Sequence, residues 1–142
     1  MHSDEKNLIV SIIALKDLLI EGISQCGVDS RLPLVSTEKR LKVFLEDRLS
    51  NVCPTHSHRI IAHPDMSSSN QLSTQLNDIK SSEHVTVAIG PEDGWTDREV
   101  QMLQNTFGFQ GVSLGSRILR TDAAVLVLLG LIQATLSQKP TD

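Results

Sequence analysis

The stretch that decides the fold reads Val85-Thr86-Val87-Ala88-Ile89-Gly90-Pro91. Its first five residues are rich in β-branched side chains and almost continuously apolar, as is typical of a central strand covered on both faces in a parallel sheet. Gly90-Pro91 ends the strand, because proline has no backbone N–H to donate to a neighbouring strand. We therefore expect a central strand over residues 85–89 and a loop directly after it.

Helix and strand signals alternate downstream of this strand. Thr96 and Glu99 form a capping-box pattern, which predicts a helix that begins there and runs to about Phe107. A second strand is expected over residues 111–114, and Gly115 ends it. The chain thus continues as helix and then strand after the first strand.

The last expected helix covers residues 122–137, with Thr121 in the capping position. Apolar residues occupy nearly every side of this helix between Ala123 and Ile132. A helix that is apolar all round must be buried, either between layers or against a second subunit. The sequence therefore predicts a homodimer.

The upstream half of the chain shows similar signals. Apolar residues recur at helical or strand spacing, and glycine, proline, serine and threonine separate the runs. The elements expected there are a helix over 8–26, a strand over 32–35, a helix capped by Ser36 and Thr37 through Leu49, a strand over 59–62 that ends before His63-Pro64, and a short helix over 72–79.

These elements predict an α/β fold with a mostly parallel open sheet and helices on both faces. Ligands of such folds bind beyond the carboxyl ends of the strands. Three loops follow expected strands, over residues 63–69, 90–95 and 115–121. We expect the functional site to be built from these loops.

The composition is that of one globular domain. The chain has 142 residues, 39% of them hydrophobic, and a formal net charge of −4. The acidic balance weighs against tight autonomous binding of nucleic acid, although Arg117 and Arg120 begin a local basic cluster.

Cys26 and Cys53 show no paired spacing and nothing resembles a secretory leader, so we expect a reducing compartment, cytoplasmic or an organelle matrix. The longest apolar run, residues 123–131, is too short to span a membrane.

Two long motifs resemble one known family. Residues 89–95 read Ile-Gly-Pro-Glu-Asp-Gly-Trp, and residues 114–122 read Leu-Gly-Ser-Arg-Ile-Leu-Arg-Thr-Asp, with Gly108-Phe109 between them. In order and spacing, this sequence resembles the RsmE-type RNA methyltransferases of the SPOUT class. A weaker likeness extends to residues 21–27 and to His63-Pro64, so the resemblance covers roughly residues 20–136.

The resemblance implies a SPOUT-type α/β trefoil knot that forms a homodimer through its knot region, with S-adenosyl-L-methionine as the cofactor. It also implies transfer of a methyl group to N3 of a uracil in small-subunit ribosomal RNA. A sulfonium donor already activates the methyl group, so the protein mainly aligns the reacting atoms and stabilises the deprotonating imide. No metal or covalent nucleophile is required for this chemistry.

The resemblance assigns site residues as well. Main-chain groups would hold the adenine, and glycines would permit their close approach. The cofactor-binding residues that it implies are His63, Pro64, Ile89, Gly90, Pro91, Glu92, Gly94, Leu114, Gly115, Arg117, Ile118 and Leu119. Arg120 and Arg117 are the expected catalytic residues, because a planar guanidinium suits both a uracil and a phosphate. The alternative is structural, with an arginine paired to Asp122 or Glu92.

The chain also departs from the family pattern. The family usually has two glycines after the glutamate, where this chain has Asp93 and then Gly94. Family members carry an N-terminal PUA-like RNA-binding barrel and then a first strand and helix of the knotted domain, and none of these is recognisable before Glu21. We interpret residues 1–142 as a single SPOUT methyltransferase domain that binds ribosomal RNA weakly or through a missing domain. The alternative is a truncated, non-catalytic dimeric SPOUT module that binds cofactor or a protein partner.

Two other kinds of site are weaker candidates. Cys53, His56 and His58, with His63 nearby, match no standard zinc pattern, so we expect no metal site. No glycine-rich phosphate fingerprint follows the expected strands, so a different nucleotide-binding α/β domain ranks last.

Overall fold

The computed structural model describes residues 15–25, 31–54, 57–63, 76–79, 84–113 and 120–138. These residues divide into two compact units, one within residues 1–39 and the other within residues 40–142. In the first unit, residues 15–25 form a helix, as predicted for this part of the 8–26 segment. Residues 31–39 form neither helix nor strand, so the strand predicted over 32–35 is wrong. Leu34 there is fully exposed, and an apolar run forms a strand only where a neighbouring strand takes up its hydrogen bonds.

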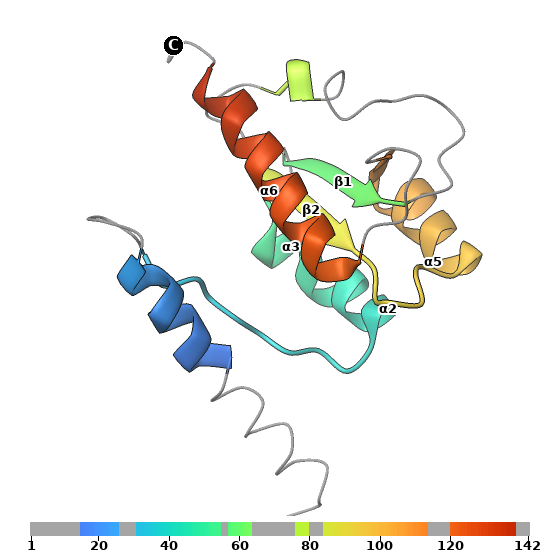
Figure 1. Ribbon diagram of the computed structural model, residues 1–142. Coiled ribbons are helices and arrows are strands. Elements are labelled where there is room, and N and C mark those ends of the chain that lie inside the picture. Colours follow the sequence, from blue (N-terminus) through green and yellow to red (C-terminus); the bar gives the residue numbers. More distant parts are fainter. Residues whose placement is uncertain are drawn as a thin grey trace, which may run out of the picture. The chain divides into compact units, whose positions relative to one another are not determined.

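A parallel three-stranded sheet forms the centre of the second unit (Figure 1). Its strands are β1 (His58–Ala62), β2 (Val85–Ile89) and β3 (Gln110–Val112), in the spatial order β2-β1-β3. The bounds of β2 are those predicted. However, β1 is the central strand of the described sheet, so the central place predicted for β2 is wrong. β1 pairs with both other strands, which a local run of β-branched residues does not reveal; accordingly its Ile60 and Ile61 are 2% and 0% exposed, whereas the residues of β2 are half-buried.

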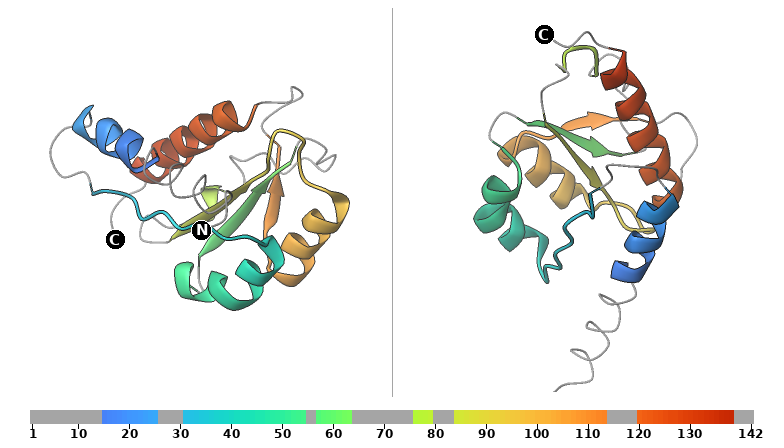
Figure 2. Two further views of the ribbon diagram at one scale, coloured as in Figure 1. Left: turned by 90° about the horizontal axis from the view of Figure 1, so that it is seen from below. Right: turned by 90° about the vertical axis from the view of Figure 1, so that its left-hand side faces the viewer.

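Helices cover both faces of this sheet (Figure 2). One face carries α6 (Thr121–Ser137), and the other carries two helices that each contain a π-helical segment. The first of these runs through α2 (Leu41–Val43), η1 (Phe44–Arg48) and α3 (Leu49–Val52), and the second runs through α5 (Asp97–Gln101) and η2 (Met102–Thr106). The predicted α/β class, with helices on both faces of a parallel sheet, is confirmed.

Alternate residues of each strand face opposite sides of the sheet, which produces two cores. The α6-side core contains the buried residues Ile60, Leu76, Ile79, Val112, Leu128 and Ile132. The π-helix-side core contains Leu45, Leu49, Cys53, Ile61, Leu103 and Phe109. The neighbouring residues Ile60 and Ile61 of β1 thus point into different cores and join both helical layers to one strand.

Capping signals place one helix start correctly and another incorrectly. Thr96 is the N-cap of α5: the N–H of Glu99 donates to its hydroxyl (3.3 Å), and its own N–H donates to the Glu99 carboxylate (2.9 Å). This confirms the capping box. The helix expected after Ser36 and Thr37 begins only at Leu41. Their hydroxyls therefore lie too far along the chain from the first helical N–H groups to cap them.

Candidate functional site

The carboxyl ends of β1 and β2 lie side by side at one edge of the sheet. Ala62, the last residue of β1, pairs with Ile89, the last residue of β2. Beyond them, the N–H of His63 donates to the carbonyl of Val112 in β3 (3.2 Å), which extends the ladder by one residue. The loops predicted to begin at His63 and Gly90 therefore start next to each other, where open parallel sheets place their ligands.

The chain turns tightly after β2. The N–H of Gly94 donates to the carbonyl of Pro91 (2.9 Å), and Gly94 has a φ of 78°. Side chains are strained in this left-handed region, so the turn requires glycine at position 94. Asp93, where the sequence departs from the family pattern, is exposed. The chain thus retains a glycine at a position of this loop that needs one.

Trp95 contacts the ends of both strands. Its indole N–H donates to the carbonyl of Ala62 at the end of β1 (3.2 Å). The same ring lies against Gly90, where an added Cβ would stand 3.1 Å from Nε1 and 3.2 Å from Cδ1 of the indole. Because carbon atoms pack at about 3.5–4.0 Å, a side chain at Gly90 would require the indole to shift by a few tenths of an ångström.

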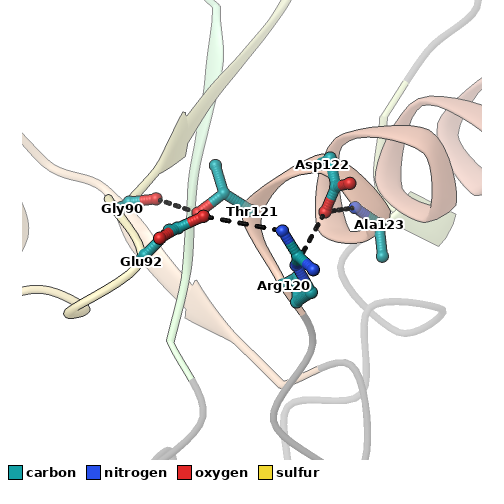
Figure 3. A network of polar contacts seen from close by, with 6 residues as sticks. All are labelled: Gly90, Glu92, Arg120, Thr121, Asp122 and Ala123. Atoms are coloured by element: carbon teal, nitrogen blue, oxygen red, sulfur yellow. Dashed lines mark hydrogen bonds and ion pairs between the residues drawn. The ribbon is translucent and has the colours of Figure 1, made fainter.

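The start of α6 faces the Gly90 loop (Figure 3). The hydroxyl of Thr121 donates to the carbonyl of Gly90 (3.0 Å). The guanidinium of Arg120 lies 3.7 Å from a carboxylate oxygen of Glu92 and 3.8 Å from one of Asp122. One hydroxyl and one shared guanidinium therefore connect the loop after β2 to the first turn of the helix.

The ion pairs of Arg120 are exposed. The side chains of Arg120, Glu92 and Asp122 are 78%, 81% and 77% exposed. Exposed pairs of this kind contribute only about 0.2–1 kcal/mol. Arg120 thus makes both of the ion pairs that the structural alternative names, with Glu92 and with Asp122. Because the pairs are weak, the guanidinium can exchange these carboxylates for another planar or anionic group at small cost.

The role of Thr121 differs from the predicted one. The sequence predicts Thr121 as the cap of α6, but the helix includes Thr121, and its N-cap is Arg120, which makes no capping hydrogen bond through its side chain. The Thr121 hydroxyl is committed to Gly90, while the carboxylate of Asp122 accepts from the N–H of Ala123 (2.9 Å). The Thr121 hydroxyl at the start of α6 therefore holds the neighbouring loop, and Asp122 satisfies one N–H group of the first turn.

The structure describes only part of the predicted site. Gly90, Glu92 and Arg120 belong to one contact network, and His63 lies half-buried at the adjacent strand end. Ile89 ends β2, and Pro91 and Gly94 belong to the loop that follows it. The predicted residues Pro64, Leu114, Gly115, Arg117, Ile118 and Leu119 lie outside the described residues.

Sequence reasoning missed the contacts of Trp95 and Thr121. In the sequence, Trp95 is only the last residue of the motif over residues 89–95, and Thr121 is predicted as a helix cap, because both patterns are local. The hydrogen bonds that they make cross 33 and 31 residues of chain. The one signal available in the sequence is that an aromatic residue closes the glycine-containing motif after β2.

Neither a metal centre nor a membrane-spanning helix is found among the residues that the structure describes. No group of three or more His, Cys, Asp and Glu side chains there is arranged to hold a metal ion. Cys53 is a buried free thiol, His58 is half-buried, and His56 lies outside the described residues. No described helix combines the length and the apolar character that a membrane crossing demands.

Comparison with known proteins gives one consistent family. The RNA methyltransferase domain family matches residues 2–133. The ribosomal RNA small subunit methyltransferase E of Treponema pallidum is 28% identical over 120 residues, which cover 82% of this chain and 41% of that protein. The protein of the same name from Synechocystis is 52% identical over 52 residues, which cover 37% of this chain and 17% of that protein.

Two solved structures are similar in fold. A putative methyltransferase from Legionella pneumophila, in complex with the bound cofactor SAM, has a TM-score of 0.73 and 26% identity, covering 94% of this chain and 50% of that one. The ribosomal RNA small subunit methyltransferase E of Neisseria gonorrhoeae, bound to S-adenosyl methionine, has a TM-score of 0.69 and 26% identity, covering 92% and 49%. The chain thus spans half or less of the length of these relatives. Because the family match extends over most of its residues, the chain belongs to the RNA methyltransferase domain family.

Proposed function

We propose that this chain is the cofactor-binding domain of an S-adenosylmethionine-dependent RNA methyltransferase of the RsmE type, which methylates N3 of a uracil in small-subunit ribosomal RNA. The observation that carries the proposal is the convergence at Gly90. There the ends of β1 and β2 meet the start of α6, through the 3.2 Å contact of Trp95 with Ala62 and the 3.0 Å contact of Thr121 with Gly90. The family match and the SAM-bound structural relatives support the same reading.

The described residues suit a sulfonium cofactor. Gly90 offers main-chain groups without a side chain of its own, which favours reading an adenine edge through the backbone. Among the described residues of the Gly90 loop and the start of α6, the carboxylates of Glu92, Asp93 and Asp122 outnumber the guanidinium of Arg120, so the field of these residues favours a cation over a phosphate. S-adenosylmethionine supplies a methyl group that its positive sulfur already activates. The proposed holders are Gly90 and its loop neighbours, His63-Pro64 and residues 114–119.

Arg120 is the proposed catalytic residue, with Arg117 beside it. The guanidinium of Arg120 stands at the start of α6, where its weak pairs with Glu92 and Asp122 leave it able to contact a substrate. It would orient the uracil or a neighbouring phosphate and stabilise charge that develops on the imide as N3 loses its proton. The remaining task of the protein is alignment of N3 with the methyl carbon.

The first test is calorimetric titration of the chain with S-adenosylmethionine, followed by transfer of a labelled methyl group to small-subunit RNA at low ionic strength. We expect measurable binding, and slow transfer whose product is 3-methyluridine, because a net charge of −4 attracts phosphates weakly. Absence of binding by a folded chain, or label on another nucleoside, would overturn the proposal.

A charge-matched pair of variants tests the role of Arg120. Arg120→Ala should leave cofactor binding within about twofold and remove transfer, because the guanidinium acts on the substrate. Lys42→Ala is the control: Lys42 on α2 is also exposed and also pairs with a carboxylate, Glu46 at 3.8 Å, but it belongs to the other helical layer. Equal loss of cofactor binding and transfer in Arg120→Ala would mean that Arg120 is structural.

We infer a homodimer formed through the outer face of α6. Leu126, Val127, Leu129 and Leu131 are 74%, 40%, 56% and 46% exposed, although Ala124, Leu128 and Ile132 on the inner face are buried. An apolar surface on both sides of one helix favours burial against a second copy. Light scattering at micromolar concentration should give a dimer mass, and Leu129→Glu should give a monomer. A monomer mass for the unmodified chain would indicate instead that another part of the same chain covers this face.

The trefoil knot of the resembled class is also part of this proposal. It requires the segment from Gly115 to Arg120 to pass behind the loop around Gly90. A crystal structure in which residues 114–120 can be traced tests this directly. A path in front of the Gly90 loop would remove the knot and would leave the parallel sheet in place.

A further inference from the structure

We propose that Trp95 and Thr121 are positioning residues that hold Gly90 between the end of β1 and the start of α6, and so fix the shape of the cofactor site. The inference rests on the proposed function, because it assigns these residues a role in cofactor binding and methyl transfer. Their contacts bring together the ends of β1 and β2, where two of the site loops begin, and the start of α6, where the third loop ends. We call Gly90, Trp95 and Thr121 the Gly90 junction.

Trp95 provides one side of the junction. Its indole N–H donates to the Ala62 carbonyl, which fixes the ring relative to β1. The ring then lies against Gly90 at a distance that would leave an added Cβ only 3.1–3.2 Å from its atoms. The ring also packs against the π-helix-side core, so it is held from behind. Trp95 therefore holds Gly90, the residue just beyond the β1–β2 ladder, against the end of β1.

Thr121 provides the other side. Its hydroxyl donates to the carbonyl of Gly90, the same residue that the indole covers. Because Thr121 is the first residue of α6, this bond also fixes where the helix begins. Arg120 immediately precedes it and reaches back to Glu92 in the same loop (Figure 3). The position of the proposed catalytic guanidinium thus depends on the Thr121 bond.

The two residues should therefore have different kinetic effects. Trp95→Phe keeps a ring against Gly90 but loses the hydrogen bond to Ala62, so it should weaken S-adenosylmethionine binding about 3- to 10-fold with little change in kcat. Thr121→Val loses the bond that anchors both Gly90 and the helix start. It should weaken cofactor binding about 3- to 10-fold and lower kcat as well, because Arg120 loses its anchor. Thr121→Ser retains the hydroxyl and should restore both parameters.

Two matched controls separate positioning from general stability. Thr135→Val removes a threonine hydroxyl from the same helix, where it donates to the carbonyl of Leu131 (2.8 Å) far from the junction. Ile132→Val perturbs the α6-side core, in which Ile132 is 7% exposed and against which Trp95 does not pack. Both controls should bind the cofactor as the unmodified chain does, even though Ile132→Val should unfold at lower denaturant concentration.

A stability cycle tests the junction without any cofactor. Gly90→Ala should be destabilising in the unmodified chain, because the new methyl group meets the indole. In a Trp95→Leu background the smaller side chain leaves space, so the same change should cost about 3- to 10-fold less in the unfolding equilibrium constant. Strictly additive effects would overturn the proposed contact.

The outcomes distinguish this proposal from the proposed function. Failure of the unmodified chain to bind S-adenosylmethionine would overturn both the proposed function and the cofactor-positioning role. In that case, energetic coupling between Gly90 and Trp95 in the stability cycle would show that the junction is structural only. If the unmodified chain binds and Trp95→Phe and Thr121→Val bind equally well, the positioning role alone is overturned. Loss of binding in the Thr135→Val control as well would also overturn it, because the effect would then not be specific to the junction.

Discussion

The two helical layers of the sheet differ in how completely the chain covers their apolar surfaces. In the layer of α2–α3 and α5–η2, the large exposed hydrophobic residues are Val43 and Val52, which are isolated. In α6, four large hydrophobic residues between positions 126 and 131 are exposed. The first layer therefore only covers the sheet. The second covers the sheet with one face and offers an apolar surface with the other.

The starts of α5 and α6 also differ, because the first is capped by its own side chains and the second contacts the loop after β2. Thr96 and Glu99 satisfy each other at the start of α5 through a capping box. At the start of α6, Arg120 occupies the N-cap without a capping side-chain bond, and Thr121 bonds to Gly90. Serine, threonine, asparagine or aspartate would be better N-caps than arginine. The α6 layer thus gives up local helix stability for contacts at the site.

The largest expected effects come from the inner faces, where the two layers should behave alike. Leu128→Ala in α6 and Leu103→Ala in η2 each remove a side chain that is at most 1% exposed. Each should lower the free energy of unfolding by about 2–5 kcal/mol, measured by urea denaturation. A loss below about 1 kcal/mol for Leu128→Ala alone would mean that α6 does not pack on the sheet as described.

The elements that local signals specify were predictable from the sequence. The run of β-branched residues before Gly90-Pro91 gives the bounds of β2, and Thr96 with Glu99 gives the start of α5. The central place of β1 was not predictable in this way, because strand order depends on pairing between distant segments. The strand predicted over 32–35 failed for a related reason, since a short apolar run does not reveal whether a partner strand exists.

The same distinction between local patterns and long-range contacts applies to the candidate site. The motifs name Gly90, Glu92 and Arg120, and these residues share one network in the structure. The roles of Trp95 and Thr121 escaped, because each depends on a contact with a residue more than 30 positions away. Local patterns assign Thr121 to capping, and only the folded chain shows that its hydroxyl is used elsewhere.

The helix starts supply the next prediction, of intermediate size. Thr96→Ala removes the capping box of α5 and should lower the free energy of unfolding by about 1 kcal/mol. Thr86→Val is the control, because the Thr86 hydroxyl makes only a 3.3 Å contact with the Ser57 hydroxyl and caps no helix. Urea denaturation of both variants provides the measurement. A Thr96→Ala variant as stable as the unmodified chain would remove the contrast between the two starts.

At the start of α6, by contrast, a substitution is expected to raise the free energy of unfolding. Arg120→Ser places a favourable capping hydroxyl at an N-cap that now has none, so it should raise the free energy of unfolding by about 0.5–1 kcal/mol. Methyl transfer should be lost in the same variant, since the proposed catalytic guanidinium is gone. Such an exchange of stability for activity is common at functional sites. A variant that loses stability together with activity would show that the ion pairs of Arg120 outweigh the missing cap.

An effect of similarly small size is expected on the outer face of α6. Gly130 lies in the helix among the exposed apolar residues, and an added Cβ there meets no atom within 4 Å. Alanine is about 0.8–1.0 kcal/mol better than glycine inside a helix, so Gly130→Ala should stabilise the dilute monomer by up to about that amount. Gly94→Ala is the matched control and should lower the free energy of unfolding, because Gly94 has a φ of 78° that alanine adopts only with strain.

Urea denaturation at two protein concentrations separates the effect of Gly130→Ala on folding from its effect on association. If a second copy packs closely over Gly130, the gain at low concentration should be reduced or reversed at high concentration, where the new methyl group enters the interface. Destabilisation by Gly130→Ala at every concentration would instead mean that another part of the same chain already covers this face, and the contrast between the two helical layers would not hold.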